Sequence, residues 1–322
     1  MSKSQPKVSI GLPVYNGENY IEEAIQSVLK QTYTNFELVI SDNASTDNTA
    51  VICQNYAAQD SRVRYCPVTE NLGAAWNFNR VFELAHGEYF KWLAHDDLIA
   101  PTYLEKCTAI LDNDPGVVLS HSQVALINEN GDVIQDYEIH LNCNIEPAHR
   151  RLKTVMLDFH LCFEVFGLIR TDAIRKTKQV MGNYGHGDGI LLERLALMGR
   201  FYEVPEVLLY GRKHPNQSMS QYGYSNKGGT NYHTYTVWFD PSKKGKLIFP
   251  AWKIVWESYR SLWIIPIKTS DRIAGHFYVI KLIRGRGRMM LHDLEYGVKF
   301  LAHRFKSNVA HKHTEIKQPI EN

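Results

Sequence analysis

The first third of the chain alternates short apolar runs with segments of helical character. The apolar runs cover residues 8–14, 36–40, 62–66 and 88–93. Each has the length and the β-branched or aromatic content of a buried strand. Helices are predicted between them, over residues 19–30, about 47–58 and 73–85. Strands that alternate with helices of this length predict a mainly parallel sheet with helices on both faces.

The middle of the chain is less regular. Residues 117–127 and 163–170 predict two further strands, and Asn128–Gly131 predicts a hairpin turn after the first of them. We expect a loop over residues 136–150 and a helix over Ile190–Met198. The α/β unit therefore continues past its first four strands, with longer connections.

Two adjacent carboxylates, Asp96 and Asp97, end the fourth predicted strand. In an open α/β sheet, ligands bind beyond the carboxyl ends of the strands. Two acids at that edge can hold a divalent cation against a phosphate. The alternative is structural, because acids at a turn can also face water or cap the next helix.

Polar residues also follow the first two predicted strands. The loop Gly11–Glu18 lacks the Gly-x-Gly-x-x-Gly pattern of dinucleotide enzymes, but Tyr15 offers a flat ring on which a base can stack. Its structural alternative is a half-buried tyrosine in a turn. Asp42 ends the second strand, where a carboxylate can accept from a base N–H or a ribose hydroxyl. Ser45 and Thr46 already supply caps for the next helix, which leaves Asp42 available for a ligand.

Three later residues are candidates for chemistry. Asp188 lies in the glycine-rich stretch Tyr184–Gly189, where its carboxylate either caps the next helix or projects toward a ligand. Arg212 can face a phosphate, and His214 can be a metal ligand. For His214 an exposed basic loop remains an equal alternative.

Charge is distributed unevenly along the chain. Residues 241–322 hold 16 Lys and Arg against 6 Asp and Glu, whereas the whole chain has a net charge of only +2. An acidic front and a basic tail disfavour a nucleic-acid-binding core. The five cysteines are widely spaced and show no Cys-x-x-Cys pair, which favours a reducing cytoplasm. No apolar run approaches the ~18 residues of a membrane span.

The basic tail is also rich in aromatic residues, with four tryptophans after residue 237. The segment Ile280–Met290 concentrates four cations. Aromatic side chains among cations suit a membrane surface that carries anionic lipid. The alternative is a set of helices that pack on the rest of the protein and expose a basic face to water.

The combined motifs closely resemble the family 2 glycosyltransferases. The resemblance is carried by Val8–Gly17, Ile21–Gln31, Leu38–Asp47, Asn71–Gly73, Gly87–Tyr89 and Asp96–Asp97, in the order and spacing of the family. It covers about residues 7–220. It implies the GT-A fold, a Rossmann-like α/β architecture with a mixed, mainly parallel sheet flanked by helices. We therefore expect a GT-A domain over residues 1–225 and a mostly helical C-terminal extension over residues 226–322.

The resemblance also implies roles for the candidate residues. Those implied for the donor nucleotide are Pro13, Tyr15, Glu18, Asp42, Asn71 and Gly73, and Arg212 joins them as a phosphate ligand. Asp96 would bind the metal as part of the Asp-x-Asp motif, with Asp97 and His214 as further ligands. Asp188 stands where the family keeps its catalytic base, and His186 is the second choice for that role.

Two positions depart from the family pattern. Ala94 stands where many members have the first acid of the Asp-x-Asp motif, and Gly187 replaces the first acid of the Glu-Asp pair that holds the base. The loss at position 94 weakens the case for metal use, although Asp97 or His95 can compensate. It also raises an alternative, a catalytically weak or inactive glycosyltransferase-like protein that binds nucleotide sugars.

The resemblance implies an inverting glycosyltransferase of hexosyltransferase type. The donor would be a nucleotide-diphospho sugar, with a UDP-sugar as the default, and the cofactor would be Mn²⁺ or Mg²⁺. The acceptor would be a glycan or a lipid-linked glycan in bacterial polysaccharide biosynthesis. We expect no nucleic-acid partner and a cytoplasmic location, with an anionic membrane surface as a candidate partner of the tail. A nucleotidyltransferase is disfavoured, because Leu12–Glu18 lacks a glycine-rich, arginine-bearing loop.

Overall fold

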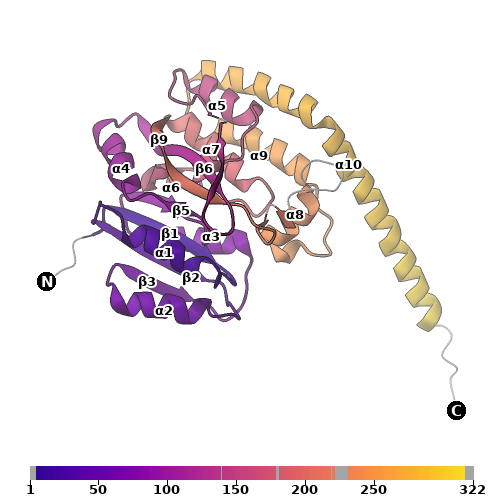
Figure 1. Ribbon diagram of the computed structural model, residues 1–322. Helices are drawn as coiled ribbons and strands as arrows, with labels where there is room; N and C mark the ends of the chain where they lie inside the picture. The colour runs from indigo at the N-terminus through magenta and orange to yellow at the C-terminus, as the bar shows by residue number, and fades with distance from the viewer. Residues whose placement is uncertain (1–4, 139, 179–180, 219, 222–230, 316–322) are drawn as a thin grey trace, which may run out of the picture.

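A computed structural model describes residues 5–138, 140–178, 181–218, 220–221 and 231–315, with side chains up to residue 305. It confirms the α/β architecture. One sheet of nine strands runs through the protein in the order β3-β2-β1-β4-β8-β6-β9-β5, and β7 pairs with β6. Helices cover both of its faces, and a long C-terminal helix extends past the body of the protein (Figure 1).

The front half of the sheet is parallel, as predicted. Its strands are β1 (Val8–Val14), β2 (Phe36–Asp42), β3 (Val63–Pro67) and β4 (Tyr89–Trp92). Strand β1 lies between β2 and β4, and all three pairs in this half are parallel. Their carboxyl ends therefore meet at one edge of the sheet, where Val14 of β1 lies opposite Asp42 of β2.

Two apolar cores explain why the helices lie where they do. On one face, α1 (Ile21–Leu29), α2 (Thr49–Gln59) and α4 (Tyr103–Asn113) pack against the buried side chains of the front strands. On the other face, α3 (Ala74–Glu83) and α7 (Gly187–Met198) pack against Phe90 and Trp92 of β4. Strands buried on both faces read as continuous apolar runs, which is why the sequence predicts them well.

The rear half of the sheet mixes parallel and antiparallel pairs. Its strands are β5 (Leu98–Ile99), β6 (Val117–Ile127), β7 (Val133–Tyr137), β8 (Leu168–Arg170) and β9 (Arg200–Arg212). Strand β6 pairs in parallel with β9 and antiparallel with β7 and β8. The predicted hairpin after β6 is present. Strands β5 and β9 were not predicted from the sequence.

Two predicted segments differ from the structure. The apolar run 163–170 forms a 3₁₀ helix, η1 (Phe163–Phe166), before the short strand β8, because a short apolar run does not distinguish a strand from a buried helical turn. The predicted loop 136–150 begins inside β7 and ends inside α5 (Ala148–Leu157). A short helix, α6 (Thr171–Lys176), follows β8.

The C-terminal region is helical. It consists of α8 (Tyr232–Phe239), the 3₁₀ helix η3 (Pro241–Lys243), α9 (Pro250–Ile264) and α10 (Thr269–Glu315). The predicted domain boundary at 225/226 lies outside the described residues. A third apolar core joins α9 and α10 to α5 and to the end of α7, so this region packs on the sheet-bearing part. None of the described helices is both long enough and apolar enough to cross a membrane.

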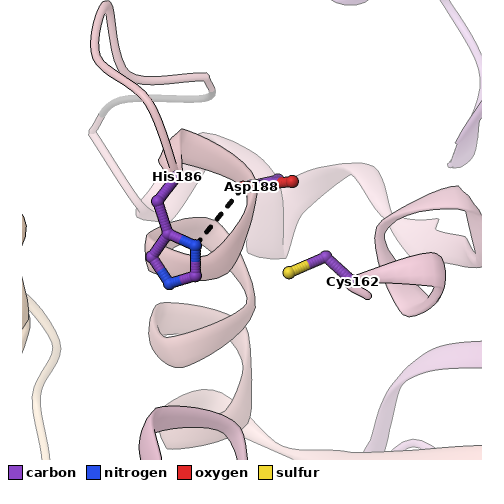
Figure 2. Close-up of side chains that lie close together, drawn as sticks. All are labelled: Cys162, His186 and Asp188. Atoms are coloured by element: carbon purple, nitrogen blue, oxygen red, sulfur yellow. Dashed lines mark ion pairs between the residues drawn. The ribbon is translucent and has the colours of Figure 1, made fainter. Parts of the chain in front are cut away.

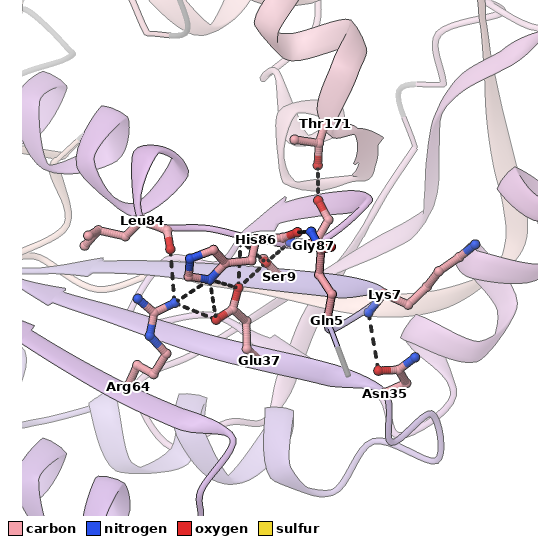
Figure 3. A network of polar contacts seen from close by, with 10 residues as sticks. All are labelled: Gln5, Lys7, Ser9, Asn35, Glu37, Arg64, Leu84, His86, Gly87 and Thr171. Atoms are coloured by element: carbon pink, nitrogen blue, oxygen red, sulfur yellow. Dashed lines mark hydrogen bonds and ion pairs between the residues drawn. The ribbon is translucent and has the colours of Figure 1, made fainter. Parts of the chain in front are cut away.

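A polar network closes the amino ends of the front strands (Figure 3). The Ser9 hydroxyl donates to Oε1 of Glu37 at 2.6 Å, and the Arg64 guanidinium donates to Oε2 at 2.6 Å. The backbone N–H of His86 donates to Oε1 at 2.8 Å. Burial raises the pKa of Glu37, but the hydrogen bonds from Ser9 and Arg64 outweigh it and hold the pKa below its ordinary value. The carboxyl ends of the same strands lie at the other edge of the sheet, where the protein has a large cleft.

Candidate active site

One large cleft of about 2810 Å³ opens at the carboxyl ends of the front strands. It extends from the loop after β1 to the start of α7 and to the side of α10. Of the predicted site residues, it is lined by Pro13, Tyr15, Asn71, Gly73, Asp96, Asp97, Asp188, Arg212 and His214. Glu18 and Asp42 are not among its lining residues.

The loop after β1 is fastened to the loop after β2. The backbone N–H of Asn16 donates to the Ser45 hydroxyl at 2.9 Å, and that of Gly17 donates to the Thr49 hydroxyl at 2.8 Å. Oε2 of Glu18 accepts from the backbone N–H of Asn48 at 2.9 Å. Glu18 therefore holds the two loops together.

Tyr15 projects from the same loop into the cleft, with 45% of its surface exposed. A ring held by a fixed backbone at a sheet edge can stack on a base without further ordering of the loop.

The carboxylate of Asp42 is buried and already has two partners in the protein. The Tyr65 hydroxyl donates to one oxygen at 2.6 Å, and the backbone N–H of Ser45 donates to the other at 2.9 Å. Asp42 thus braces the loop that holds Asn16. Its predicted contact with the nucleoside would require an additional partner or a change in these bonds.

The turn at residues 71–73, which is hydrogen-bonded to Asn43, forms the next part of the cleft wall. Oδ1 of Asn71 accepts from Nδ2 of Asn43 and from the backbone N–H of Gly73, both at 2.9 Å. Gly73 has a φ of +89°, and a Cβ there would lie 2.3 Å from Cδ of Pro241 in η3. Only glycine fits this position without displacing the C-terminal region. Asn43 was missed, although its place directly after Asp42 at a strand end was the available signal.

Asp96 and His214 meet across the cleft floor. Oδ2 of Asp96 lies 3.0 Å from Nε2 of His214, and the side chains are 15% and 7% exposed. They come from the loop after β4 and from the residues after β9, far apart in sequence. Burial raises the pKa of Asp96, but His95 and His214 outweigh it and hold that pKa below its ordinary value. The carboxylate is therefore ionised and placed beside an imidazole.

Asp97 and Arg212 are both hydrogen-bonded within the protein. Oδ1 of Asp97 accepts from the backbone N–H of Arg212 at 2.9 Å. The Arg212 guanidinium is fully buried and donates to Glu23 at 2.7 Å, to the carbonyl of Asp96 at 2.9 Å and to that of Glu129 at 2.8 Å. Arg212 therefore fixes the loop that bears Asp96. The guanidinium makes four hydrogen bonds within the protein, so its predicted contact with a phosphate would require its remaining N–H or a change in these bonds, and it stays a prediction.

Asp188 lies in the first turn of α7, with His186 and Cys162 beside it (Figure 2). Its Oδ1 accepts from the backbone N–H of Gly189 at 2.8 Å and lies 4.0 Å from Nδ1 of His186. The side chain keeps 34% of its surface open, and the residue lines the cleft. The predicted N-cap position belongs to His186, whose φ is +75°.

The surroundings distinguish Asp188 from His186 as a proton acceptor. Burial raises the pKa of Asp188 above its ordinary value. Burial, followed by the positive charge of Arg286, lowers the pKa of His186 to about 3. A carboxylate with a raised pKa is the better base of the two near neutral pH.

The C-terminal helices complete this wall of the cleft. Tyr232 of α8 and Arg286 of α10 both line it, and the Arg286 guanidinium donates to the Tyr232 hydroxyl at 3.2 Å. Lys281 and His292 of α10 line it as well. The sequence analysis singled out the cations around residue 284 but did not place them at the site.

The family model for glycosyl transferase family 2 matches residues 9–177. The chain belongs to this family. That range includes both loops of the front half, the Asn71–Gly73 turn and Asp96. Asp188 and His214 lie beyond it, so their assignment rests on the geometry of the cleft.

Related bacterial proteins are named as glycosyltransferases. An uncharacterised glycosyltransferase of Haemophilus influenzae is 26% identical over 223 residues, which cover 68% of this chain and 69% of that protein. TuaG of Bacillus subtilis, named for teichuronic acid biosynthesis, is 40% identical over 106 residues, or 33% of this chain and 42% of TuaG. An uncharacterised glycosyltransferase of Rickettsia felis is 38% identical over 133 residues, or 40% of this chain, but the match spans only 21% of that protein.

Solved structures share the fold. TarS 1–349 of S. aureus, in complex with UDP, covers 88% of this chain and 90% of its own at a TM-score of 0.52 and 16% identity. The mannosyltransferase PcManGT of Pyrobaculum calidifontis, in complex with GDP-Man and Mn²⁺, covers 98% of this chain and 81% of its own at a TM-score of 0.55 and 16% identity. At this identity the likeness establishes the fold alone.

The donor set of the cleft fits a divalent cation. Asp96 supplies a carboxylate oxygen and His214 an imidazole nitrogen, both at the cleft, and both ligand types suit Mn²⁺. Mg²⁺ prefers oxygen ligands, so His214 favours Mn²⁺ of the two. The remaining positions would fall to diphosphate oxygens and water. Ala94 contributes no ligand, and Asp97 is engaged with the backbone of Arg212.

Proposed function

We propose that this family 2 protein is an inverting glycosyltransferase of hexosyltransferase type. It would move a sugar from a nucleotide-diphospho sugar to a hydroxyl of a glycan or a lipid-linked acceptor. The observation that carries the proposal is the shared cleft, which is lined both by the Asp96–His214 pair near the strand ends and by the carboxylate of Asp188 at the start of α7.

The front half of the cleft would hold the donor. Tyr15 and Pro13 would contact the nucleoside, and the Asn71–Gly73 turn would lie along the donor. Asp96 and His214 would hold Mn²⁺ or Mg²⁺, which offsets the negative charge of the diphosphate when it is bound. Arg212 would act indirectly by fixing the loop of Asp96.

The rear half of the cleft would supply the base. Asp188 would take the proton of the acceptor hydroxyl while that oxygen attacks the anomeric carbon. The bond from the anomeric carbon to the diphosphate oxygen breaks, and its electron pair leaves with the nucleoside diphosphate. A single displacement of this kind inverts the anomeric configuration. The raised pKa of Asp188 supports this role, because the carboxylate gains proton affinity near neutral pH.

The comparisons guide the choice of substrates. The TarS structures contain UDP and UDP-GlcNAc, and the mannosyltransferase structure contains GDP-Man, so we propose a UDP-sugar as the default donor and a GDP-sugar as the next choice. The name of TuaG supports an acceptor in bacterial polysaccharide biosynthesis. All five cysteines are free thiols, which supports a reducing, cytoplasmic compartment.

A catalytically weak or inactive nucleotide-sugar-binding protein is the competing proposal. It is favoured by Ala94 and Gly187, which replace acids of the family pattern. The two proposals share the donor site and differ only in turnover.

A donor screen separates them. Calorimetry with UDP and GDP, with Mn²⁺ and with chelator, should show binding that requires the metal and that is lost in Asp96→Ala. A panel of UDP- and GDP-sugars with Mn²⁺ should then show slow release of nucleoside diphosphate from one donor. Binding without any release would favour the inactive protein. Equal affinity with chelator or in Asp96→Ala would refute the metal site, and a product with retained anomeric configuration would refute the inverting mechanism.

A further inference from the structure

The outward side of α10 is apolar along most of its length. Large apolar side chains recur there every three or four residues from Ile273 to Ile283 and again from Leu291 to Phe305, so they share one side of the helix. They are Ile273, Phe277, Ile280, Ile283, Leu291, Leu294, Val298, Leu301 and Phe305, with exposed fractions from 39% to 71%. We call this set the apolar stripe. A contiguous exposed apolar surface of this kind marks an interaction site.

The opposite side of α10 is buried in the protein. Val279, Leu282 and Met290 pack into the core shared with α5 and α9. The apolar stripe is therefore exposed on the side of α10 away from this core. Helix α10 extends beyond the rest of the protein (Figure 1). No described part of this chain covers the stripe, because its side chains keep their exposure within the whole folded structure.

Helix α9 adds three exposed indoles beside the stripe. Trp252, Trp256 and Trp263 are 44%, 54% and 57% exposed. Nε1 of Trp252 donates to the carbonyl of Met290 at 3.0 Å, and the Trp263 ring lies 5.9 Å from the ring of His276. Both contacts are with α10, so the indoles extend the apolar stripe sideways. Tryptophan is enriched at membrane–water interfaces, where an amphipathic ring sits at the headgroup level.

Cations accompany the stripe. Lys281, Arg284, Arg288 and Lys299 are exposed, and none of them takes part in an ion pair among the described residues. Residues 272–305 hold seven Lys and Arg against two acids, Asp293 and Glu295. Asp293 is buried and bound to His233 and to the amide of Ala251, so Glu295 is the one acid of this stretch that faces water.

We propose that the apolar stripe and the indoles of α9 dock the protein on an anionic lipid bilayer. The apolar side chains would enter the interface while the flanking cations contact the headgroups. Charge complementarity selects this occupant over a second copy of the chain. Two copies joined through the stripe would bring Arg284 and Arg288 close to like charges, whereas an anionic surface neutralises them.

Docking in this way would fix the orientation of the cleft relative to the bilayer surface. Lys281, His292 and Tyr296 line the cleft from α10, on the side next to the apolar stripe. A bilayer on the stripe would therefore lie beside the wall that faces the proposed base. Under the proposed glycosyl transfer, on which this step rests, a lipid-linked acceptor would enter the cleft from the headgroup region along this wall.

Vesicle co-sedimentation of the full chain, without donor or acceptor, tests the docking. The protein should bind vesicles of phosphatidylcholine mixed with phosphatidylglycerol and leave vesicles of phosphatidylcholine alone largely unbound. Binding should weaken strongly at about 1 M salt, where screening shortens to about 3 Å. Equal binding to both kinds of vesicle, or none to either, would overturn the proposal.

Paired substitutions locate the surface. Arg284→Gln with Arg288→Gln should lower partitioning by roughly 30-fold, about fivefold for each cation. Leu291→Ser with Leu294→Ser should lower it by roughly tenfold or more. The controls are Arg175→Gln with Lys176→Gln on α6 and Val51→Ser on α2, which are also exposed and should bind as the unchanged protein does. Equal losses in the controls would refute this location.

Sedimentation velocity without vesicles tests the alternative occupant. The full chain should be monomeric at the concentrations used for binding. A dimer that dissociates in the Leu291→Ser/Leu294→Ser variant would assign the stripe to a second copy and overturn the bilayer proposal. Nucleotide binding measured on the same samples keeps the two proposals apart. Intact vesicle binding without donor binding would contradict the glycosyltransferase proposal alone, and the reverse would contradict the docking alone.

Discussion

The two sides of the cleft are built in different ways. The donor side is assembled from loops that follow consecutive parallel strands, and its hydrogen bonds join residues about 30 positions apart, such as Asn16 to Ser45 and Asn43 to Asn71. The base side combines Cys162, the start of α7, and helices α8 and α10.

The difference indicates which ligand each side of the cleft would select. The donor side fixes a backbone platform on which a common ligand, the nucleoside diphosphate, can be held. The base side depends on elements from distant parts of the chain, which can change with the acceptor while the platform stays the same. The largest responses to substitution should therefore lie on the base side, where buried charges hold α7 against the C-terminal helices.

The ion pair between Arg194 of α7 and Glu257 of α9 should give the largest loss of stability. The Arg194 guanidinium donates to Oε2 of Glu257 at 2.7 Å, and both side chains are almost fully buried. Glu257→Ala leaves a buried cation without its partner, which should lower the free energy of unfolding by about 3–5 kcal/mol. Urea unfolding measures it.

The double variant Arg194→Met/Glu257→Met is the control for that effect. It removes both charges together, so it should lose less stability than Glu257→Ala. A double variant that loses as much as the single one would show that packing, and not the unpaired charge, accounts for the cost.

Glu193 should make the base side sensitive to pH. Its Oε1 accepts from the Ser258 hydroxyl at 3.0 Å, Oε2 has no partner among the described residues, and burial raises its pKa to about 7. The folded protein therefore keeps a proton that the unfolded chain releases near pH 4.5, so this group lowers stability as pH rises from about 4.5 to 7. Glu193→Gln has no titrating carboxyl group at this position, so it should not show this decrease in stability with pH.

The measurement is the difference in unfolding free energy between Glu193→Gln and the unchanged protein. We expect the unfolding free energy of Glu193→Gln, relative to that of the unchanged protein, to increase by about 2–3 kcal/mol between pH 5 and pH 8. A difference that stays constant over this range would mean that Glu193 is ionised in the folded protein.

The network around Glu37, at the other end of the front strands, should respond less. Its carboxylate is bound by Ser9, Arg64 and His86, but the Arg64 side chain is 35% exposed. Because Arg64 can be rehydrated when its partner is lost, Glu37→Ala should cost only about 1–2 kcal/mol. A loss as large as that of Glu257→Ala, measured by the same urea titration, would remove the contrast between the two regions.

Sequence reasoning succeeded where local pattern decides the structure. Apolar runs of strand length identified β1 to β4, and the acids at the end of β4 identified the site edge, because parallel strands bring their carboxyl ends together. The resemblance supplied Tyr15, Asn71 and Gly73, which line the cleft. These features depend on short segments whose geometry is set by their own residues.

The remaining features depend on contacts between distant segments. No sequence pattern shows that the Arg212 guanidinium binds Glu23 and three carbonyl groups, or that Asp97 binds the amide of Arg212. The ligand roles of Asp97 and Arg212 stay predictions, but their partners within the protein were not predicted. The place of Arg286 on the cleft wall likewise follows from the packing of α10 on α5 and α9, which the sequence does not encode locally.

The most direct test of the central claim is a single comparison on Asp188→Asn. The donor found in the screen, with Mn²⁺ and its acceptor, should show turnover lowered by about 10²–10⁴-fold, because the amide keeps the shape of the side chain but does not take the proton. Nucleotide affinity on the same preparation should stay nearly unchanged, since the donor side is built from other loops. Near-normal turnover, or a loss of nucleotide binding together with turnover, would contradict the division of the cleft into a donor side and a base side.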